Sequence, residues 1–145
     1  MGIEQTSSVL AILDDDESVQ ISLQDLIESE GLSALCFGSA EQFLDSTARY
    51  EAACLIADVR MPGISGLELQ AKLKSERCLL PIIFITARGD IPMAVRAVQR
   101  GAIDFLTKPI DRPRSSFLLK GRLSRIARIE KRRPIKKPSP PGMRL

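Results

Sequence analysis

The chain has 145 residues, 44% apolar and 27% charged, with three cysteines and a net charge of +3, as expected of one soluble globular domain without a disulfide framework or a zinc site. No apolar run approaches the roughly 18 residues of a membrane-spanning helix, and the N-terminus shows no secretory signal, so we expect a cytoplasmic protein. The absence of histidine from the sequence excludes serine–histidine–aspartate triads, imidazole metal sites and phosphohistidine on this chain.

Five apolar segments of strand length alternate with helical patterns along the chain. The expected strands are residues 9–13, 32–37, 53–59, 81–87 and 103–107. Continuous apolar strands that alternate with helices are typical of a parallel sheet covered on both faces. We therefore predict an α/β fold with a doubly wound five-stranded parallel sheet. Of the common strand orders of such sheets we adopt 2-1-3-4-5, the flavodoxin-like (βα)5 arrangement.

The segments between the strands carry apolar residues at helical spacing. In the first segment, the shared apolar face consists of Val19, Leu23, Leu26 and Ile27. Residues 39–47 form the second expected helix, with Ser39 as N-cap and Gln42 three residues later, as in a capping box. The third helix is expected to end near Ser75, and the fourth is expected to end at Gly101.

Polar side chains follow four of the five predicted strands. They are Asp14, Asp15 and Asp16 after the first strand, Asp58 in the third, Thr86 in the fourth and Lys108 after the fifth. Each has an ordinary structural explanation by itself, and Asp16 in particular fits the N-cap of the first helix. In the predicted strand order these strand ends are contiguous, and ligand sites of open parallel sheets form at the carboxyl ends of strands. We therefore interpret the side chains as one functional site.

The residue types in this set indicate phosphoryl chemistry. Asp14, Asp15 and Asp58 offer the carboxylate oxygens that a hard cation such as Mg²⁺ prefers. Lys108 and Thr86 are suited to hold a tetrahedral anion opposite the cation. A carboxylate between a metal ion and a lysine can accept a phosphoryl group, because this transfer needs mainly positioning and charge neutralisation.

Three motifs carry a resemblance to a known family: LDDDE, IADVRMPGISGLEL and PIIFITARGDIPMAVRAVQRGAIDFLTKP. From about Val9 to Ile110 the chain resembles the CheY-like receiver domain of bacterial two-component response regulators, and it is most similar to the FixJ-type regulators. The resemblance implies a cis Lys108–Pro109 bond. It also implies these roles: Asp58 as phosphoacceptor; Asp14, Asp15, Asp58 and the backbone carbonyl of Arg60 as ligands of Mg²⁺ or Mn²⁺; Lys108 as the partner of the phosphoryl group; Thr86 and Phe105 as switch residues.

By this resemblance the protein is a phosphoacceptor switch and not an enzyme, limited to self-catalysed phosphotransfer and slow autodephosphorylation. A sensor histidine kinase would supply the phosphoryl group to Asp58. Phosphorylation would then change the face formed by the fourth helix, the fifth strand and the fifth helix, through which the protein would form homodimers or release an output element.

An aspartyl phosphatase of the haloacid dehalogenase type is the competing interpretation, with Asp14 as nucleophile and Asp16 as acid/base. In that family Thr or Val is usual at the position of Ser18, and an acidic pair follows the lysine, whereas none follows Lys108 here. Asp58 would also have no role. We therefore prefer the receiver interpretation.

The C-terminal part departs from the family in its charge. Residues 1–111 hold 9 basic and 17 acidic side chains, whereas residues 112–145 hold 12 basic side chains and 1 acidic one. We divide the chain into a flexible N-terminus at 1–7, a receiver domain at 8–128 with an atypical fifth helix at about 113–130, and a disordered basic, Pro-rich tail at 131–145.

FixJ-type regulators normally continue into a helix-turn-helix domain, and the 36 residues after Pro109 are too few for one. We therefore expect a stand-alone or truncated transcription regulator without sequence-specific DNA binding. For the tail, four interpretations stay open: a solvated segment, non-specific nucleic-acid binding through phosphates, contact with an acidic partner or an anionic membrane, and translation of an accidental reading frame.

Overall fold

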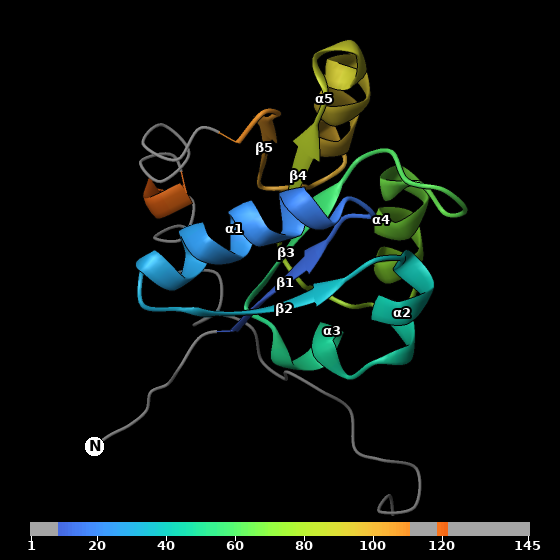
Figure 1. Ribbon diagram of the computed structural model, residues 1–145. Coiled ribbons are helices and arrows are strands. Elements are labelled where there is room, and N and C mark those ends of the chain that lie inside the picture. Colours follow the sequence, from blue (N-terminus) through green and yellow to red (C-terminus); the bar gives the residue numbers. More distant parts are fainter. Residues whose placement is uncertain (1–8, 111–118, 122–145) are drawn as a thin grey trace, which may run out of the picture.

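A computed structural model of the chain, shown in Figure 1, describes residues 9–110 and 119–121. Its strands form one parallel sheet in the order β2-β1-β3-β4-β5, which confirms the predicted fold class and strand order. The strands are β1 (Val9–Leu13), β2 (Ser33–Phe37), β3 (Cys54–Asp58), β4 (Ile82–Thr86) and β5 (Asp104–Thr107).

The helices cover both faces of this sheet, and Figure 1 shows α1 on one face and α2, α3 and α4 on the other. The helices are α1 (Glu17–Ser29), α2 (Ala40–Asp45), α3 (Ala48–Glu51), α4 (Gly66–Ser75) and α5 (Ile91–Gln99), with a 3-10 turn at Arg88–Asp90. The fourth helix expected from the sequence is therefore α5 of the structure. Gly101 follows the end of α5 in the left-handed region, with φ of 114°, as predicted.

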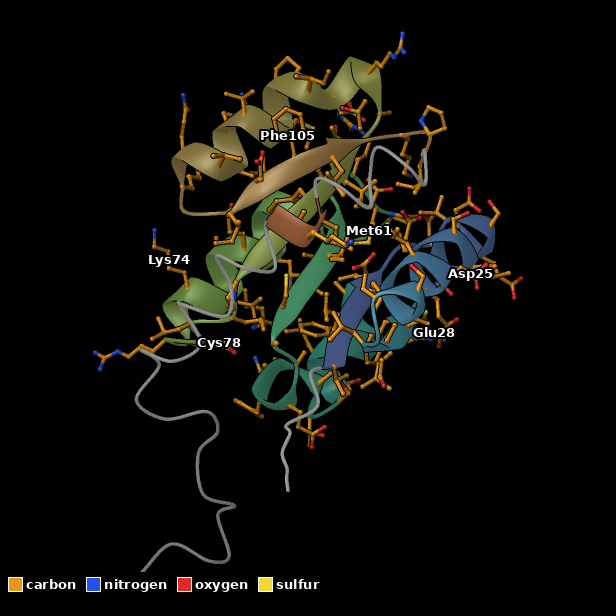
Figure 2. All side chains as sticks on the ribbon, turned by 90° about the vertical axis from the view of Figure 1, so that its left-hand side faces the viewer. Asp25, Glu28, Met61, Lys74, Cys78 and Phe105 are labelled. Atoms are coloured by element: carbon orange, nitrogen blue, oxygen red, sulfur yellow. The ribbon has the colours of Figure 1, made fainter. Side chains whose placement is uncertain are left out.

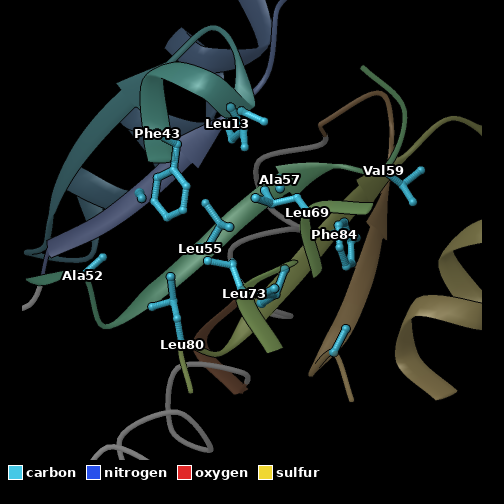
Figure 3. Close-up of a cluster of buried hydrophobic side chains, with 14 of the residues drawn as sticks. Leu13, Phe43, Ala52, Leu55, Ala57, Val59, Leu69, Leu73, Leu80 and Phe84 are labelled. Atoms are coloured by element: carbon cyan, nitrogen blue, oxygen red, sulfur yellow. The ribbon is translucent and has the colours of Figure 1, made fainter. Parts of the chain in front are cut away.

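Successive strand residues point to opposite faces of the sheet and build two buried clusters. One cluster joins strand residues such as Leu13, Leu55 and Phe84 to α2, α3, α4 and α5, and Figure 3 shows its centre. The other joins residues such as Ile12 and Ile56 to the apolar face of α1. Because both faces of the sheet are covered, only the strand ends remain available for polar groups.

The structure confirms the helix expected at 39–47, which is α2 with Ser39 as its N-cap, and a short helix that the sequence did not predict, α3, follows it. The hydroxyl of Ser46 donates to the carbonyl of Phe43 (2.8 Å) and accepts from the amide of Ala48 (3.1 Å), so this side chain ends one helix and begins the next. A serine that bonds the neighbouring backbone in this way competes with continuation of the helix.

The predicted capping box at the start of α2 is half correct. Ser39 accepts from the amide of Gln42 (3.1 Å), but the side chain of Gln42 accepts from the amide of Gly38 (2.9 Å) and not from that of Ser39. A complete capping box is present at α4, where the Ser65 and Glu68 side chains accept from each other's backbone amides.

The predictions for the two ends of the chain lie largely outside the described residues. These are the flexible N-terminus at 1–7, most of the fifth helix at about 113–130, and the tail at 131–145. Of the fifth helix, residues 119–121 are described and are helical. Leu119 is fully buried in the cluster that contains the apolar face of α1. Within the part of the chain that the structure describes, every helix is too short or too polar to span a bilayer.

The N-terminus of α4 packs so closely on the sheet that it requires glycine. A Cβ on Gly66 would lie 2.7 Å from the ring of Phe84, 2.8 Å from Cα of Val59 and 2.9 Å from the carbonyl oxygen of Asp58. Two of these neighbours are backbone atoms, which cannot move aside as a flexible side chain can. The position of α4 is therefore fixed against the end of β3, where Asp58 lies.

We predict that Gly66→Ala lowers the free energy of unfolding by about 1–3 kcal/mol, because the added methyl group overpacks this contact. Urea denaturation measures the change. Gly89→Ala is the matched control, since a Cβ at Gly89 meets no atom within 4 Å, and we expect it to change the stability by less than about 0.5 kcal/mol. Equal stability of the two variants would contradict the packing argument.

Candidate functional site

The sheet brings the polar strand ends together, as the strand order predicts. The ammonium group of Lys108, which follows β5, lies 2.8 Å from Oδ2 of Asp58 at the end of β3. The same group lies 3.3 Å from Oδ2 of Asp14, which follows β1. Residues 50 positions apart in the chain are thus in direct contact.

Both buried aspartates are held in the same way by the backbone that follows them. Oδ1 of Asp14 accepts from the amide of Asp16 (2.9 Å), and Oδ1 of Asp58 accepts from the amide of Arg60 (3.0 Å). Each carboxylate therefore fixes one oxygen on a backbone N–H and presents the other to Lys108. This local turn needs a short side chain with an acceptor oxygen at the first position, which aspartate supplies at both sites.

Asp15 completes an acidic group, because carboxylate oxygens of Asp14, Asp15 and Asp58 all lie within 4.8 Å of one another. Asp14 and Asp58 are buried, whereas Asp15 is exposed. Oδ2 of Asp14 is buried, and its ion pair with Lys108 (3.3 Å) is the one contact found for it within the described residues. A buried carboxylate oxygen that shares one lysine with Asp58, next to a third carboxylate, fits the all-oxygen ligand set of a hard divalent cation.

The electrostatics of the group follow from burial and from the single lysine. Burial is the main cause that raises the pKa of Asp14 to about 6, helped by the charge of Asp58 and opposed by the Asp16 amide and Lys108. Burial lowers the pKa of Lys108, but its contacts with Asp58 and Asp14 outweigh that effect and the pKa is raised. Lys108 therefore stays charged, while burial disfavours the charged form of Asp14.

Asp16 stands apart from this acidic group and caps α1. Its Oδ1 accepts from the amide of Ser18 (2.9 Å) and from the Ser18 hydroxyl (2.7 Å), which confirms the predicted N-cap. The hydrogen bonds from Ser18 lower the pKa of Asp16. A carboxyl group with a lowered pKa is a poor proton donor, so the geometry does not favour the acid/base role that the phosphatase interpretation gives Asp16.

The two predicted switch residues lie on β4 and β5, the strands that follow β3 in the sheet. Thr86 is fully buried at the end of β4, and its hydroxyl donates to the carbonyl of Ala87 (3.0 Å). Its own carbonyl accepts from the amide of Lys108 (2.8 Å), and the Lys108–Pro109 bond is cis, as expected. Phe105 is half-buried on β5, on the side toward α5, as Figure 2 shows.

Sequence reasoning missed Gln20, which positions the loop that carries the aspartates. Gln20 lies on α1, and its side-chain nitrogen Nε2 donates to the carbonyls of Asp14 (2.6 Å) and Phe37 (3.2 Å). The ends of β1 and β2 are thereby held together at the base of the acidic group. The sequence offers only a weak signal for this role, a polar residue beside the apolar face of α1.

The side chain of Arg60 forms a second contact that the sequence did not reveal. Its guanidinium lies 3.0 Å from Oδ1 of Asp90 and 3.1 Å from Sδ of Met93, although 64% of the side chain is exposed. The loop after β3 is thus joined to the start of α5. The expected metal contact of Arg60 concerns its backbone carbonyl and stays a prediction.

Comparison with known proteins gives one consistent result. The family model described as "Response regulator receiver domain" matches residues 10–116. The response regulator protein TodT of Pseudomonas putida is 53% identical over 103 residues, covering 71% of this chain and 45% of that protein. The transcriptional regulatory protein FixJ of Azorhizobium caulinodans is 46% identical over 100 residues, covering 69% of this chain and 47% of FixJ.

Solved structures agree with these sequence relatives. Full-length FixJ from B. japonicum superposes with a TM-score of 0.75 at 34% identity, over 88% of this chain and 63% of that one. The structure named FIXJ-N gives 0.72 at 33% identity, over 86% of this chain and 96% of the other. The chain spans about half the length of the named relatives that it matches in sequence.

We predict that Asp14→Asn stabilises the metal-free protein at neutral pH. Because the folded-state pKa of about 6 lies above the ordinary value of 3.8, the contribution of Asp14 to stability is complete below about pH 4 and is lost as the pH rises through 6. A neutral amide removes that loss. We expect a gain of about 1–2 kcal/mol at pH 7.5, with allowance for solvent screening, and no gain at pH 4.

Urea denaturation at the two pH values measures this difference. Asp25→Asn, which removes an exposed carboxylate of α1 outside the acidic group, is the matched control and should change little. An Asp14→Asn variant less stable than the parent at pH 7.5 would show that the charge of Asp14 stabilises the fold.

Proposed function

The chain belongs to the response regulator receiver family, and from that premise we propose that it is a phosphorylation switch whose phosphoacceptor is Asp58. The observation that carries the proposal is the contact between Asp58 Oδ2 and the Lys108 ammonium (2.8 Å), next to two further aspartates. A partner sensor histidine kinase, in the cytoplasm, supplies the phosphoryl group. The receiver domain extends over residues 8–128 in this proposal.

The acidic group is proposed to hold Mg²⁺ or Mn²⁺ through Asp14, Asp15, Asp58 and the backbone carbonyl of Arg60. The buried oxygen of Asp14, which shares Lys108 with Asp58, and the mutual distance of the three carboxylates support this ligand set. The bound cation supplies positive charge beside the phosphoryl oxygens, which phosphoryl transfer requires.

Asp58 and Lys108 have different roles in the proposed reaction. A carboxylate oxygen of Asp58 attacks phosphorus, the bond from phosphorus to the histidine nitrogen of the kinase breaks, and an acyl phosphate remains on Asp58. Lys108, already paired with Asp58, neutralises part of the charge that arrives with the phosphoryl group. The product is a modified protein and not a released compound, so the domain acts as a switch and not as an enzyme; slow autodephosphorylation resets it.

The switch is proposed to pass through Thr86 and Phe105 to one face of the domain. This face is made by α5 (the fourth helix expected from the sequence), β5 and the helix expected at about 113–130. The Thr86 hydroxyl gives up its bond to the Ala87 carbonyl and turns toward the phosphoryl group, and Phe105 moves inward. Both residues lie on the two strands nearest α5, which supports this route. The changed face then forms a homodimer or releases an output element.

Control of transcription is proposed for the whole protein on the basis of its relatives. The FixJ relatives are named transcriptional regulatory proteins, and the matched region is about half of their length. The competing phosphatase has no support among the relatives, and Asp16, its proposed acid/base, caps α1 instead.

We predict that incubation with acetyl phosphate and Mg²⁺ adds one phosphoryl group, about 80 Da by intact mass, and that Asp58→Asn abolishes the addition because the nucleophilic oxygen is lost. Asp25→Asn is the matched control and should react like the parent. Steady release of phosphate that survives Asp58→Asn but not Asp14→Asn would contradict the switch and favour the phosphatase.

We also predict that Mg²⁺ raises the midpoint of thermal unfolding, because a ligand that binds only the folded state stabilises it, by about 1.4 kcal/mol at ten times its Kd. Asp15→Asn should reduce the shift by removing one exposed ligand. Asp16→Asn is the control in the same loop, since asparagine caps helices equally well. An equal loss in both variants would place the ion elsewhere.

A further inference from the structure

The side chain of Arg60 connects the loop after β3 with the first turn of α5, and the proposed phosphoryl transfer gives this contact no role. The guanidinium donates from Nε to Oδ1 of Asp90 (3.1 Å), and a terminal nitrogen lies 3.0 Å from the same oxygen. That terminal nitrogen also lies 3.1 Å from Sδ of Met93 on α5. The contact therefore joins the loop that begins at Asp58 to the start of α5.

The partners of Arg60 use little of its hydrogen-bonding capacity. A guanidinium carries five N–H donors in a planar fork and binds best to two acceptor oxygens at once. Here two of its nitrogens share one oxygen of Asp90, and its contact with Met93 is to a thioether sulfur, a weak acceptor. The Arg60 side chain is 64% exposed, and exposed ion pairs are weak. A stronger anion within reach would therefore compete with Asp90 for this guanidinium.

Asp90 has an alternative to its pairing with Arg60. It is the N-cap residue of α5, and an aspartate at this position ordinarily accepts from a backbone amide of the first helical turn. Asp16, the N-cap of α1, does so with the amide of Ser18 (2.9 Å). The carboxylate of Asp90 makes no such capping bond and accepts from Arg60 instead. The start of α5 thus has two possible arrangements, with Asp90 either on Arg60 or capping the helix.

The proposed phosphoacceptor lies beside the base of the Arg60 side chain, whose backbone amide donates to Oδ1 of Asp58 (3.0 Å). The hydrogen bond to Asp90 is the main cause that raises the pKa of Arg60, and the charge of Asp58 acts in the same direction. The guanidinium is therefore already in the field of that carboxylate. A phosphoryl group on Asp58 would replace one negative charge by about two and would offer acceptor oxygens for two parallel guanidinium bonds.

We propose that Arg60 is a latch on α5 that opens when Asp58 is phosphorylated. In the closed latch the guanidinium holds Asp90 and Met93, as in the structure. In the open latch it binds the phosphoryl oxygens, and the freed carboxylate of Asp90 caps α5. The proposal rests on the phosphorylation of Asp58 and adds a second route to α5, separate from that of the two proposed switch residues.

The test follows the full ¹⁵N-labelled chain by NMR in Mg²⁺, before and after addition of acetyl phosphate, with intact mass as the measure of phosphorylation. We expect the Nε–H signal of Arg60 and the amide signals of Asp90 and Met93 to move on phosphorylation. The same treatment of the Asp58→Asn variant should leave all three signals in place.

Two variants open the latch without phosphorylation, and each is read on the opposite side of the contact. Asp90→Asn should raise the ratio of open to closed latch about two- to fivefold, as expected for the loss of one exposed ion pair. The Arg60 Nε–H signal then moves away from its position in the unphosphorylated parent. Arg60→Gln should move the Met93 amide signal toward its position in the phosphorylated parent. Arg96→Gln, which removes an exposed arginine of α5 outside this contact, is the matched control and should leave the Arg60 signal unchanged.

The outcomes separate the latch from the proposed function. If no phosphoryl group adds to the parent, the proposed function fails and the latch fails with it. If the group adds while the Arg60 Nε–H and Met93 amide signals stay in place, the latch is overturned and the phosphorylation of Asp58 stands. An Arg60 signal that responds equally to Asp90→Asn and Arg96→Gln, or a Met93 amide unaffected by Arg60→Gln, would also overturn the latch.

Discussion

The acidic group at the carboxyl ends of the strands depends on one interaction, the pairing of the Lys108 ammonium with two buried carboxylates. Asp14 and Asp58 would repel each other at the end of neighbouring strands, and burial would increase that repulsion. Lys108 reaches both, at 3.3 and 2.8 Å, only because β5 pairs with β4 and β4 with β3. The strand order thus determines whether these charges can be tolerated at all.

One lysine does not neutralise three carboxylates, and the imbalance shows at Asp14. Lys108 lowers the pKa of this group, yet burial outweighs the lysine and the pKa is raised. Exposed Asp15 keeps its contact with water, whereas the buried carboxylate of Asp14 does not and must share Lys108 with Asp58. The folded protein therefore carries an excess of negative charge at a place shaped by backbone hydrogen bonds. A bound divalent cation would neutralise this excess charge, which is the physical reason for proposing a metal there.

The sequence predicted the sheet and the convergence of its polar ends, because both follow from local patterns. Apolar runs of strand length mark the strands, and the residues after Leu13 and Ala57 are acidic whatever the tertiary structure is. The cap formed by Asp16 is equally local, since its partner is two residues away.

The sequence did not predict contacts whose partners are distant in the chain. Gln20 reaches the carbonyl of Phe37, and Arg60 reaches Asp90, across 17 and 30 residues. Nothing local distinguishes these side chains from solvated ones. The incomplete capping box at α2 has a different cause: the Gln42 side chain accepts from the amide of Gly38 in place of that of Ser39, and residue type alone does not decide between neighbouring backbone donors.

Helix α4 connects the two edges of the sheet. Its first residue, Gly66, is held against the carbonyl of Asp58, and its Gln70 donates to the carbonyl of Ala97 on α5. Because α5 borders the face proposed to change on phosphorylation, α4 connects the end of β3, where Asp58 lies, with that face.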